Sequence, residues 1–138
     1  MSTVLLAAQP ALGHINPLLA IGRTLQARGH RVAFGGFGTR PIEATIREAG
    51  FELYPIRSLP VALGSMRLLL LPLLSGFRET AFAARVFYSG QDSLARAFEG
   101  VLERFRPEVV VFDFAYLGAA FAAENRGLPY ALVYHAGL

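Results

Sequence analysis

The sequence contains no cysteine, no lysine and only two aspartates. The lack of cysteine excludes disulfide bonds and thiolate metal sites, and it fits a reducing compartment such as the cytoplasm. All thirteen basic residues are arginines, scattered along the chain, and the net charge is only +3. Because no basic stripe with interleaved aromatic residues occurs, the sequence argues against a nucleic-acid partner.

Long uninterrupted apolar runs are also missing. The first run, residues 4–8, is shorter than the roughly 7–15 apolar residues of a signal peptide, and no basic residue precedes it. The most apolar segment, residues 59–74, contains Arg67 and two prolines, whereas a membrane-spanning helix needs about 20 apolar residues. We therefore expect no transmembrane span. Core packing, the lining of a lipophilic pocket and a peripheral membrane contact all stay open for this segment.

What the chain does contain is a regular alternation of short apolar runs and helical patterns. With 54% hydrophobic residues in 138, it is large enough for one buried core. The patterns predict strands at 4–8, 31–35, 51–56, 108–112 and 130–134. They predict helices at 16–28, 39–49, 78–105 with a break near 89–90, and 116–125.

This alternation predicts an α/β fold with right-handed crossovers. The expected sheet is Rossmann-like, doubly wound and parallel, with strand order 3-2-1-4-5. At the first helix, Asn16 is expected to be the N-cap, Pro17 to lie in the first turn and Gly29 to end the helix.

Two polar residues lie where such a sheet binds its ligands, at the carboxyl ends of strands that flank the reversal of strand order. His14 follows the first strand in an expected loop, and Asp113 ends the fourth, so we expect their side chains to face each other. A carboxylate fixes the tautomer of an imidazole and stabilises the imidazolium that forms when the ring accepts a proton from a substrate hydroxyl. Two plainer interpretations stay open: a solvated loop histidine, and an aspartate that caps the next helix.

The run GHINPLLAIGRTLQARGHRVAF, residues 13–34, resembles the opening of the UDP-glycosyltransferase superfamily of GT-B enzymes. It is most similar to bacterial members that glycosylate antibiotics and other apolar small molecules. RPEVVVFD at 106–113 and GLPYALV at 127–133 resemble the fourth and fifth strands of that family. The likeness covers most of the chain except about 57–100, and it implies that the chain is the N-terminal half of a GT-B fold.

The resemblance implies an inverting transfer of a sugar from a nucleotide diphosphate sugar to a hydroxyl of an apolar small molecule. His14 would deprotonate the acceptor hydroxyl and Asp113 would pair with His14. The co-substrate would be a UDP- or dTDP-sugar, with no further cofactor and no metal. Acceptor contacts are expected from seven residues: Leu12, Ile15, Phe37, Met66, Leu70, Phe87 and His135. Phe77, Phe82 and Tyr88 are candidates to extend that wall, or they belong to the core.

Two other motifs are interpreted as structural. His30 is expected at a helix-to-strand joint away from the carboxyl edge. The glycine-rich run at 34–38 matches neither G-x-G-x-x-G nor a Walker A loop, so we expect a turn, bordering the acceptor cleft at most, rather than a phosphate cradle.

The family's donor signature, a His/Gly-rich loop with an acidic residue, does not occur in residues 1–138. We therefore expect one incomplete acceptor-binding domain without the C-terminal donor-binding domain. Such a chain would be inactive alone and would work within a longer enzyme or beside a separate donor-binding subunit. The alternatives are a non-catalytic partner subunit, a truncated relic, a sugar-nucleotide epimerase of the same fold, and half of a lipid-linked sugar transferase.

Overall fold

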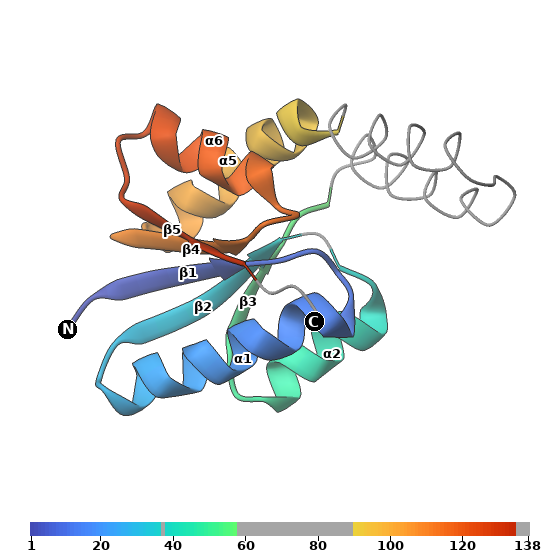
Figure 1. The fold of residues 1–138 in the computed structure, drawn as a ribbon, viewed down its shortest axis with the longest axis vertical. Coiled ribbons are helices and arrows are strands. Elements are labelled where there is room, and N and C mark those ends of the chain that lie inside the picture. The colour runs from blue at the N-terminus through green and yellow to red at the C-terminus, as the bar shows by residue number, and fades with distance from the viewer. Residues whose placement is uncertain (37, 58–89, 135–138) are drawn as a thin grey trace, which may run out of the picture.

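The computed structural model describes residues 1–36, 38–57 and 90–134. In these ranges, strands and helices alternate along the chain. Their bounds are β1 (Thr3–Ala7), α1 (Leu12–Ala27), β2 (Arg31–Gly36), α2 (Arg40–Glu48), β3 (Glu52–Pro55), α5 (Gln91–Phe105), β4 (Val109–Asp113), α6 (Leu117–Asn125) and β5 (Tyr130–Val133). The strands pair in parallel in the order β3-β2-β1-β4-β5, which confirms the predicted doubly wound sheet (Figure 1).

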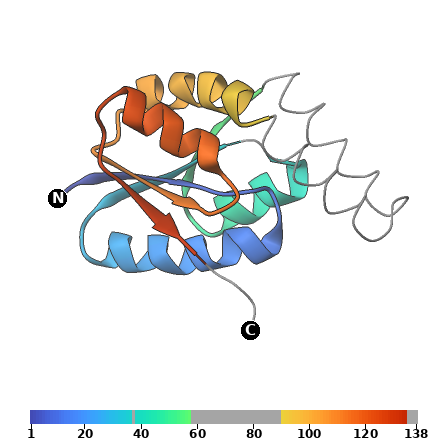
Figure 2. The same cartoon turned by 45° about the horizontal axis from the view of Figure 1, so that its top comes forward.

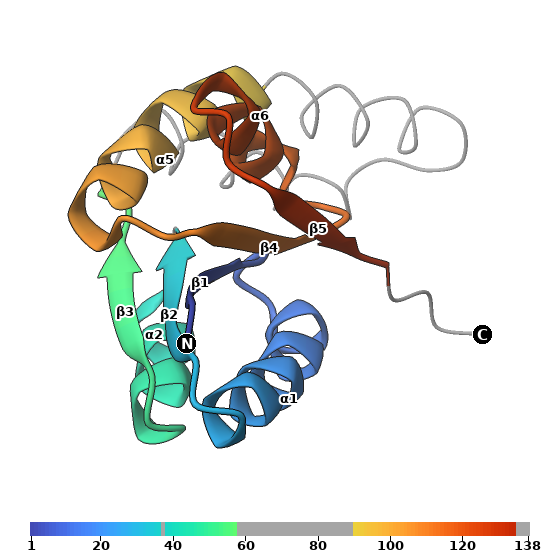
Figure 3. The same ribbon diagram turned by 90° about the vertical axis from the view of Figure 1, so that its left-hand side faces the viewer.

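The elements form three layers. Helices α1 and α2 cover one face of the sheet and α5 and α6 cover the other (Figure 1), as the side view in Figure 3 also shows. The central strand β1 is buried on both faces: Leu5 and Ala7 pack towards α5 and α6, whereas Val4 and Leu6 pack towards α1 and α2. A strand covered on both faces needs apolar residues at every position, which explains the uninterrupted run after Thr3.

The first helix begins one turn earlier than predicted. Asn16 is not its cap: the helix starts at Leu12, Ala11 occupies the N-cap, and no side chain caps it. Pro17 therefore lies in the second turn, where it cannot donate the hydrogen bond that the Gly13 carbonyl would otherwise accept.

Burial explains why the first turn forms without a polar cap. Ile15, Leu18 and Leu19 are buried in the layer between α1 and the sheet. Packing of an apolar helix face contributes more to helix stability than local preference does. At the other end the prediction is confirmed, because Gly29 follows the helix with a φ of +82°.

The other boundaries agree with the predicted ones to within two residues, apart from the predicted helix at 78–105. Its second part is α5, and residues 78–89 lie outside the described residues. Strand β5 forms one edge of the sheet (Figure 2), and its Tyr130 and Leu132 are 46% and 52% exposed. Among the helices that the structure describes, none has both the length and the apolar character to span a bilayer.

Candidate active site

His14 and Asp113 meet at the carboxyl edge of the sheet. Nδ1 of His14 lies 2.8 Å from Oδ2 of Asp113, although 99 residues separate the two in sequence. The strand register explains the contact, since Ala7 at the end of β1 lies beside Phe112 near the end of β4. The predicted juxtaposition is confirmed, except that His14 lies in the first turn of α1 rather than in a loop. The catalytic roles of the two residues stay a prediction.

Asp113 is fully buried, and both of its carboxylate oxygens accept hydrogen bonds. Oδ1 accepts from the backbone N–H of Ala115 at 2.7 Å, and Oδ2 accepts from that of Gln9 at 3.2 Å in addition to His14. A buried carboxylate is tolerated only with such partners. The carboxylate thereby ties the segment after β1 to the segment after β4.

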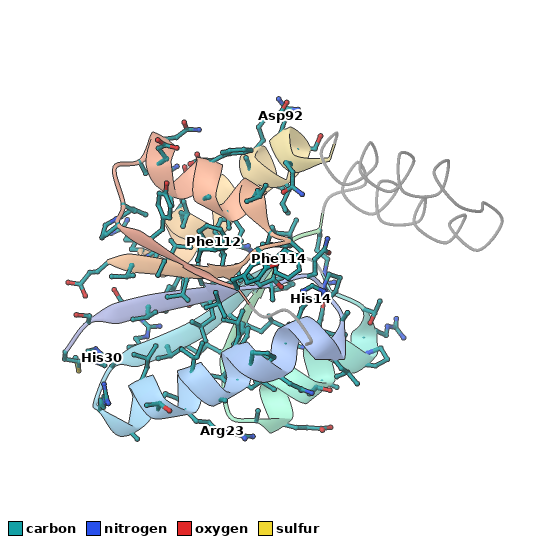
Figure 4. The ribbon with its side chains drawn as sticks, viewed as in Figure 1. His14, Arg23, His30, Asp92, Phe112 and Phe114 are labelled. Carbon is teal, nitrogen blue, oxygen red and sulfur yellow. The ribbon has the colours of Figure 1, made fainter. Side chains whose placement is uncertain are left out.

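The alternative role of Asp113 as a helix cap is wrong. Tyr116 occupies the N-cap of α6, and no side chain caps that helix. The other aspartate, Asp92, is exposed in the first turn of α5, far from His14 (Figure 4). Only one of the two aspartates therefore lies at the carboxyl edge.

The pairing with Asp113 determines which nitrogen of His14 can act on a substrate. A carboxylate only accepts hydrogen bonds, so Nδ1 carries the proton and donates it. In the neutral ring, Nε2 then carries the lone pair. The side chain of His14 is 26% exposed whereas that of Asp113 is 0% exposed. The arrangement can therefore accept a proton at Nε2 and stabilise the resulting imidazolium through Asp113.

The sequence interpretation missed Phe114, the residue after Asp113. Its ring centroid lies 5.6 Å from that of His14 and 5.3 Å from that of Tyr134, and it is 36% exposed. Its backbone N–H donates to the Val133 carbonyl at 3.2 Å, which fixes its position beside β5. The sequence could have indicated Phe114 as a site residue, because it directly follows Asp113, the aspartate that ends β4.

Two of the seven predicted acceptor contacts lie in described residues. Leu12 is 54% exposed in the same turn of α1 as His14. Ile15 is 2% exposed and belongs to the core beneath α1, where it lines a small cavity of about 20 Å³ together with Ala8 and Phe34. The other five, Phe37, Met66, Leu70, Phe87 and His135, lie outside the described residues, as do residues 59–74, Phe77, Phe82 and Tyr88.

Gly35 and Gly36 end strand β2, and Phe37, in the run at 34–38 where a turn was expected, lies outside the described residues. A Cβ at Gly35 would lie 2.6 Å from Cγ1 of Val101, and one at Gly36 would lie 2.8 Å from the hydroxyl of Tyr116. These glycines therefore allow α5 and Tyr116 to approach the sheet closely, which is a packing reason for the motif.

A second polar cluster, also missed, surrounds Glu43 on α2. This carboxylate is buried, lines the same small cavity, and accepts hydrogen bonds from Arg57 at 2.6 and 2.9 Å and from Arg47 at 3.3 Å. The hydrogen bond from Arg57 lowers the pKa of Glu43 below its ordinary value, against the opposing effect of burial. The sequence did contain a signal for this cluster, because Glu43 lies next to Ile42 on the face of α2 that is buried.

The remaining described histidine has a structural position, as predicted. His30 accepts a hydrogen bond at Nδ1 from the backbone N–H of Ser2, at 3.2 Å, and lies at the opposite end of the sheet from His14 (Figure 4). Within residues 1–36, 38–57 and 90–134, no three histidine or carboxylate side chains gather into a metal-binding group.

Comparison with known proteins identifies relatives of the chain. No family model matches it. It is 26% identical to 4'-demethylrebeccamycin synthase of Lentzea aerocolonigenes over 140 residues, which cover 94% of this chain and 31% of that protein. It is 28% identical to the NDP-glycosyltransferase YjiC of Bacillus licheniformis over 120 residues, which cover 86% of this chain and 29% of that protein. The chain thus spans about a third of the length of these relatives.

Solved structures show the same fold. The glycosyltransferase of kitacinnamycin superposes with a TM-score of 0.71 at 25% identity, over 96% of this chain and 30% of that one. A glycosyltransferase of Streptomyces sp. SF2575, SsfS6, solved with thymidine diphosphate, superposes with a TM-score of 0.71 at 18% identity, over 97% and 38%. The chain is therefore similar in sequence to bacterial glycosyltransferases, and its fold matches a part of solved GT-B glycosyltransferases.

Proposed function

We propose that this chain is the acceptor-binding part of an inverting glycosyltransferase, with His14 as the base. One observation carries the proposal: the imidazole of His14 donates from Nδ1 to the fully buried carboxylate of Asp113 at the carboxyl edge of the sheet. This is the edge at which doubly wound sheets bind their ligands, beside the reversal of strand order between β1 and β4.

The proposed reaction is a single displacement. The acceptor hydroxyl oxygen attacks the anomeric carbon of the sugar while Nε2 of His14 accepts the hydroxyl proton. The new C–O bond forms as the bond to the nucleotide diphosphate breaks, and the diphosphate leaves with the electron pair. Attack opposite the leaving group inverts the anomeric configuration. Asp113 stabilises the imidazolium that forms at His14.

The donor is proposed to be a UDP- or dTDP-sugar, bound mainly by polypeptide other than residues 1–138. The thymidine diphosphate in the SsfS6 structure supports a nucleotide of this class, and the threefold greater length of the relatives supports a second part. Accordingly, residues 1–138 alone transfer nothing and require a donor-binding domain or subunit. We propose a cytoplasmic location, with which the cysteine-free sequence agrees.

Reconstitution tests this proposal. The chain is mixed with a candidate donor-binding polypeptide, a UDP- or dTDP-sugar and a panel of apolar alcohols and phenols, and products are identified by mass spectrometry. We expect a glycoside of inverted configuration only when all components are present. No turnover with any combination would contradict an enzymatic function.

A second candidate is a non-catalytic acceptor-binding module. It requires only a binding surface near His14, where Leu12 and Phe114 are exposed. The module would bind the same apolar hydroxyl compounds without transferring sugar to them, whatever polypeptide is added. Binding measured by calorimetry beside the transfer assay separates the two candidates.

A further inference from the structure

Three rings follow one another outward from the carboxyl edge of the sheet. The imidazole of His14 contacts Phe114, with centroids 5.6 Å apart and planes tilted by 43°. Phe114 contacts Tyr134, with centroids 5.3 Å apart and planes tilted by 54°. Both separations lie in the range in which aromatic rings attract each other. We call His14, Phe114 and Tyr134 the aromatic row.

Exposure increases along the row. The side chain of His14 is 26% exposed, Phe114 is 36% exposed and Tyr134 is 73% exposed. Asp113, behind His14, is fully buried. The row therefore begins at the group proposed to remove the proton and presents aromatic surface to solvent beside it. Figure 4 shows Phe114 next to His14 at this edge.

Backbone contacts hold the row in place. Phe114 donates its N–H to the Val133 carbonyl, so the segment after β4 is bonded to the end of β5, from which Tyr134 follows. The carboxylate of Asp113 holds both His14 and the N–H of Ala115, one residue beyond Phe114. A surface that is fixed before its ligand arrives binds with a smaller loss of conformational entropy.

We propose that the aromatic row binds a planar aromatic ring of the acceptor, so that the preferred acceptors are phenols and related aromatic hydroxyl compounds. This inference rests on the proposed function, since it places the acceptor hydroxyl at His14. A flat ring packs against Phe114 and Tyr134 with the favourable offset or edge-to-face geometry of aromatic pairs. A saturated ring of the same size gains only the burial of apolar surface. Phe114 and Tyr134, which would pack against the ring, are uncharged aromatic side chains, which suits an uncharged ring.

A matched pair of ligands tests the proposal: 2-naphthol, which is planar and aromatic, and 2-decalol, its fully saturated counterpart. Binding of 2-naphthol to the chain is followed by its fluorescence, and 2-decalol is titrated as a competitor. We expect 2-naphthol to bind roughly 3- to 10-fold more tightly, which corresponds to one favourable aromatic pair.

Two variants locate the effect. Phe114→Leu keeps an apolar side chain and should abolish most of the preference for 2-naphthol while leaving the affinity for 2-decalol within about twofold. The matched control is Phe121→Leu on α6, where a phenylalanine is 42% exposed outside the aromatic row. This control should keep the preference. Circular dichroism spectra of both variants confirm that they are folded.

The outcomes also separate this inference from the proposed function. Equal affinities for the two ligands, no detectable binding of 2-naphthol, or a preference that survives Phe114→Leu would each overturn the aromatic row as a binding surface. Transfer to saturated alcohols in the reconstituted enzyme would in those cases leave the proposed function standing. Conversely, a preference that depends on Phe114, without transfer to any alcohol or phenol, supports aromatic binding and counts against the transferase.

Discussion

The amino ends and the carboxyl ends of the parallel strands form opposite edges of the sheet, and the polar residues at these two edges differ in burial. At the amino edge, Thr3 contacts Glu108 and Arg31 pairs with Glu52, and these contacts are exposed to solvent. At the carboxyl edge, His14 donates to a carboxylate that is fully buried. Exposed pairs contribute little to stability, whereas a buried carboxylate is retained only where it is fully bonded.

His14 and His30 show what this difference means for function. His30 accepts one backbone hydrogen bond from Ser2 at the amino edge, and that contact needs no titratable partner. His14 has its tautomer set by Asp113 and an aromatic neighbour in Phe114. Both histidines follow a glycine in the sequence. Only the position of His14 at the reversal of strand order provides it with a carboxylate.

The largest expected effect separates these two histidines. In the reconstituted enzyme, His14→Gln should lower kcat for sugar transfer by about 10²- to 10⁴-fold, because the base is lost. His30→Gln should leave kcat within about twofold, since the Ser2 contact supports only local structure. The value of kcat is measured from initial rates at saturating donor. An equal loss of kcat in both variants would contradict the claim that only the histidine at the carboxyl edge acts in the reaction.

The second largest expected effect is on thermodynamic stability, and it compares Asp113 at the carboxyl edge with Glu108 at the amino edge. Asp113→Ala leaves the buried N–H groups of Gln9 and Ala115 without their acceptor, so the free energy of unfolding should fall by about 1–3 kcal/mol. Glu108→Ala, on the exposed amino edge, should cost under about 1 kcal/mol. Urea denaturation of the chain measures both values. A larger loss for Glu108 than for Asp113 would contradict the comparison.

A smaller effect concerns pH and the buried acid Glu43. Its pKa is lowered in the folded chain, chiefly by the hydrogen bond from Arg57, so the folded state binds fewer protons than the unfolded state. The resulting stabilisation is full above the ordinary glutamate pKa of about 4.3 and is lost as pH falls through the lowered value. We expect Glu43→Gln to remove about 1 kcal/mol of this acid-dependent stability, because Arg57 is largely exposed.

The control for this prediction is Glu52, whose pKa is also lowered, chiefly by a hydrogen bond from Arg31. Both side chains of that pair are half exposed, so Glu52→Gln should change the acid dependence less than Glu43→Gln does. Thermal unfolding between pH 3 and pH 7 compares the two variants with the unaltered chain. An unchanged pH profile in Glu43→Gln would show that the cluster around Glu43 adds no stability.

The fold and the central pair could be predicted from the sequence for physical reasons. Apolar runs of five residues indicate strands that are covered on both faces, and the alternation with helices restricts the order of those strands. Once β1 and β4 are neighbours, residues 14 and 113 must lie at the same edge. The Asn16–Pro17 pair was misleading, because it carries a local capping signal that the packing of Ile15 and Leu18 outweighs.

The rest of the site depends on contacts that a linear pattern does not contain. Arg57 reaches Glu43 from beyond β3, across 14 residues, and nothing in the spacing selects that arginine among thirteen. Phe114 follows a buried strand directly, and its exposure depends on how the end of β5 passes beside it. The acceptor contacts that the resemblance implied were mostly assigned to residues outside the described ranges.

The most direct test of the central claim is the tautomer of His14, measured on the chain by long-range ¹H–¹⁵N correlation NMR of its histidine side chains. The account predicts that neutral His14 carries its proton on Nδ1, held by Asp113, and that Asp113→Asn perturbs this signal while His30 is unaffected. A His14 ring protonated on Nε2, with its resonances unchanged in Asp113→Asn, would contradict the account, because the nitrogen proposed to accept the substrate proton would already carry one.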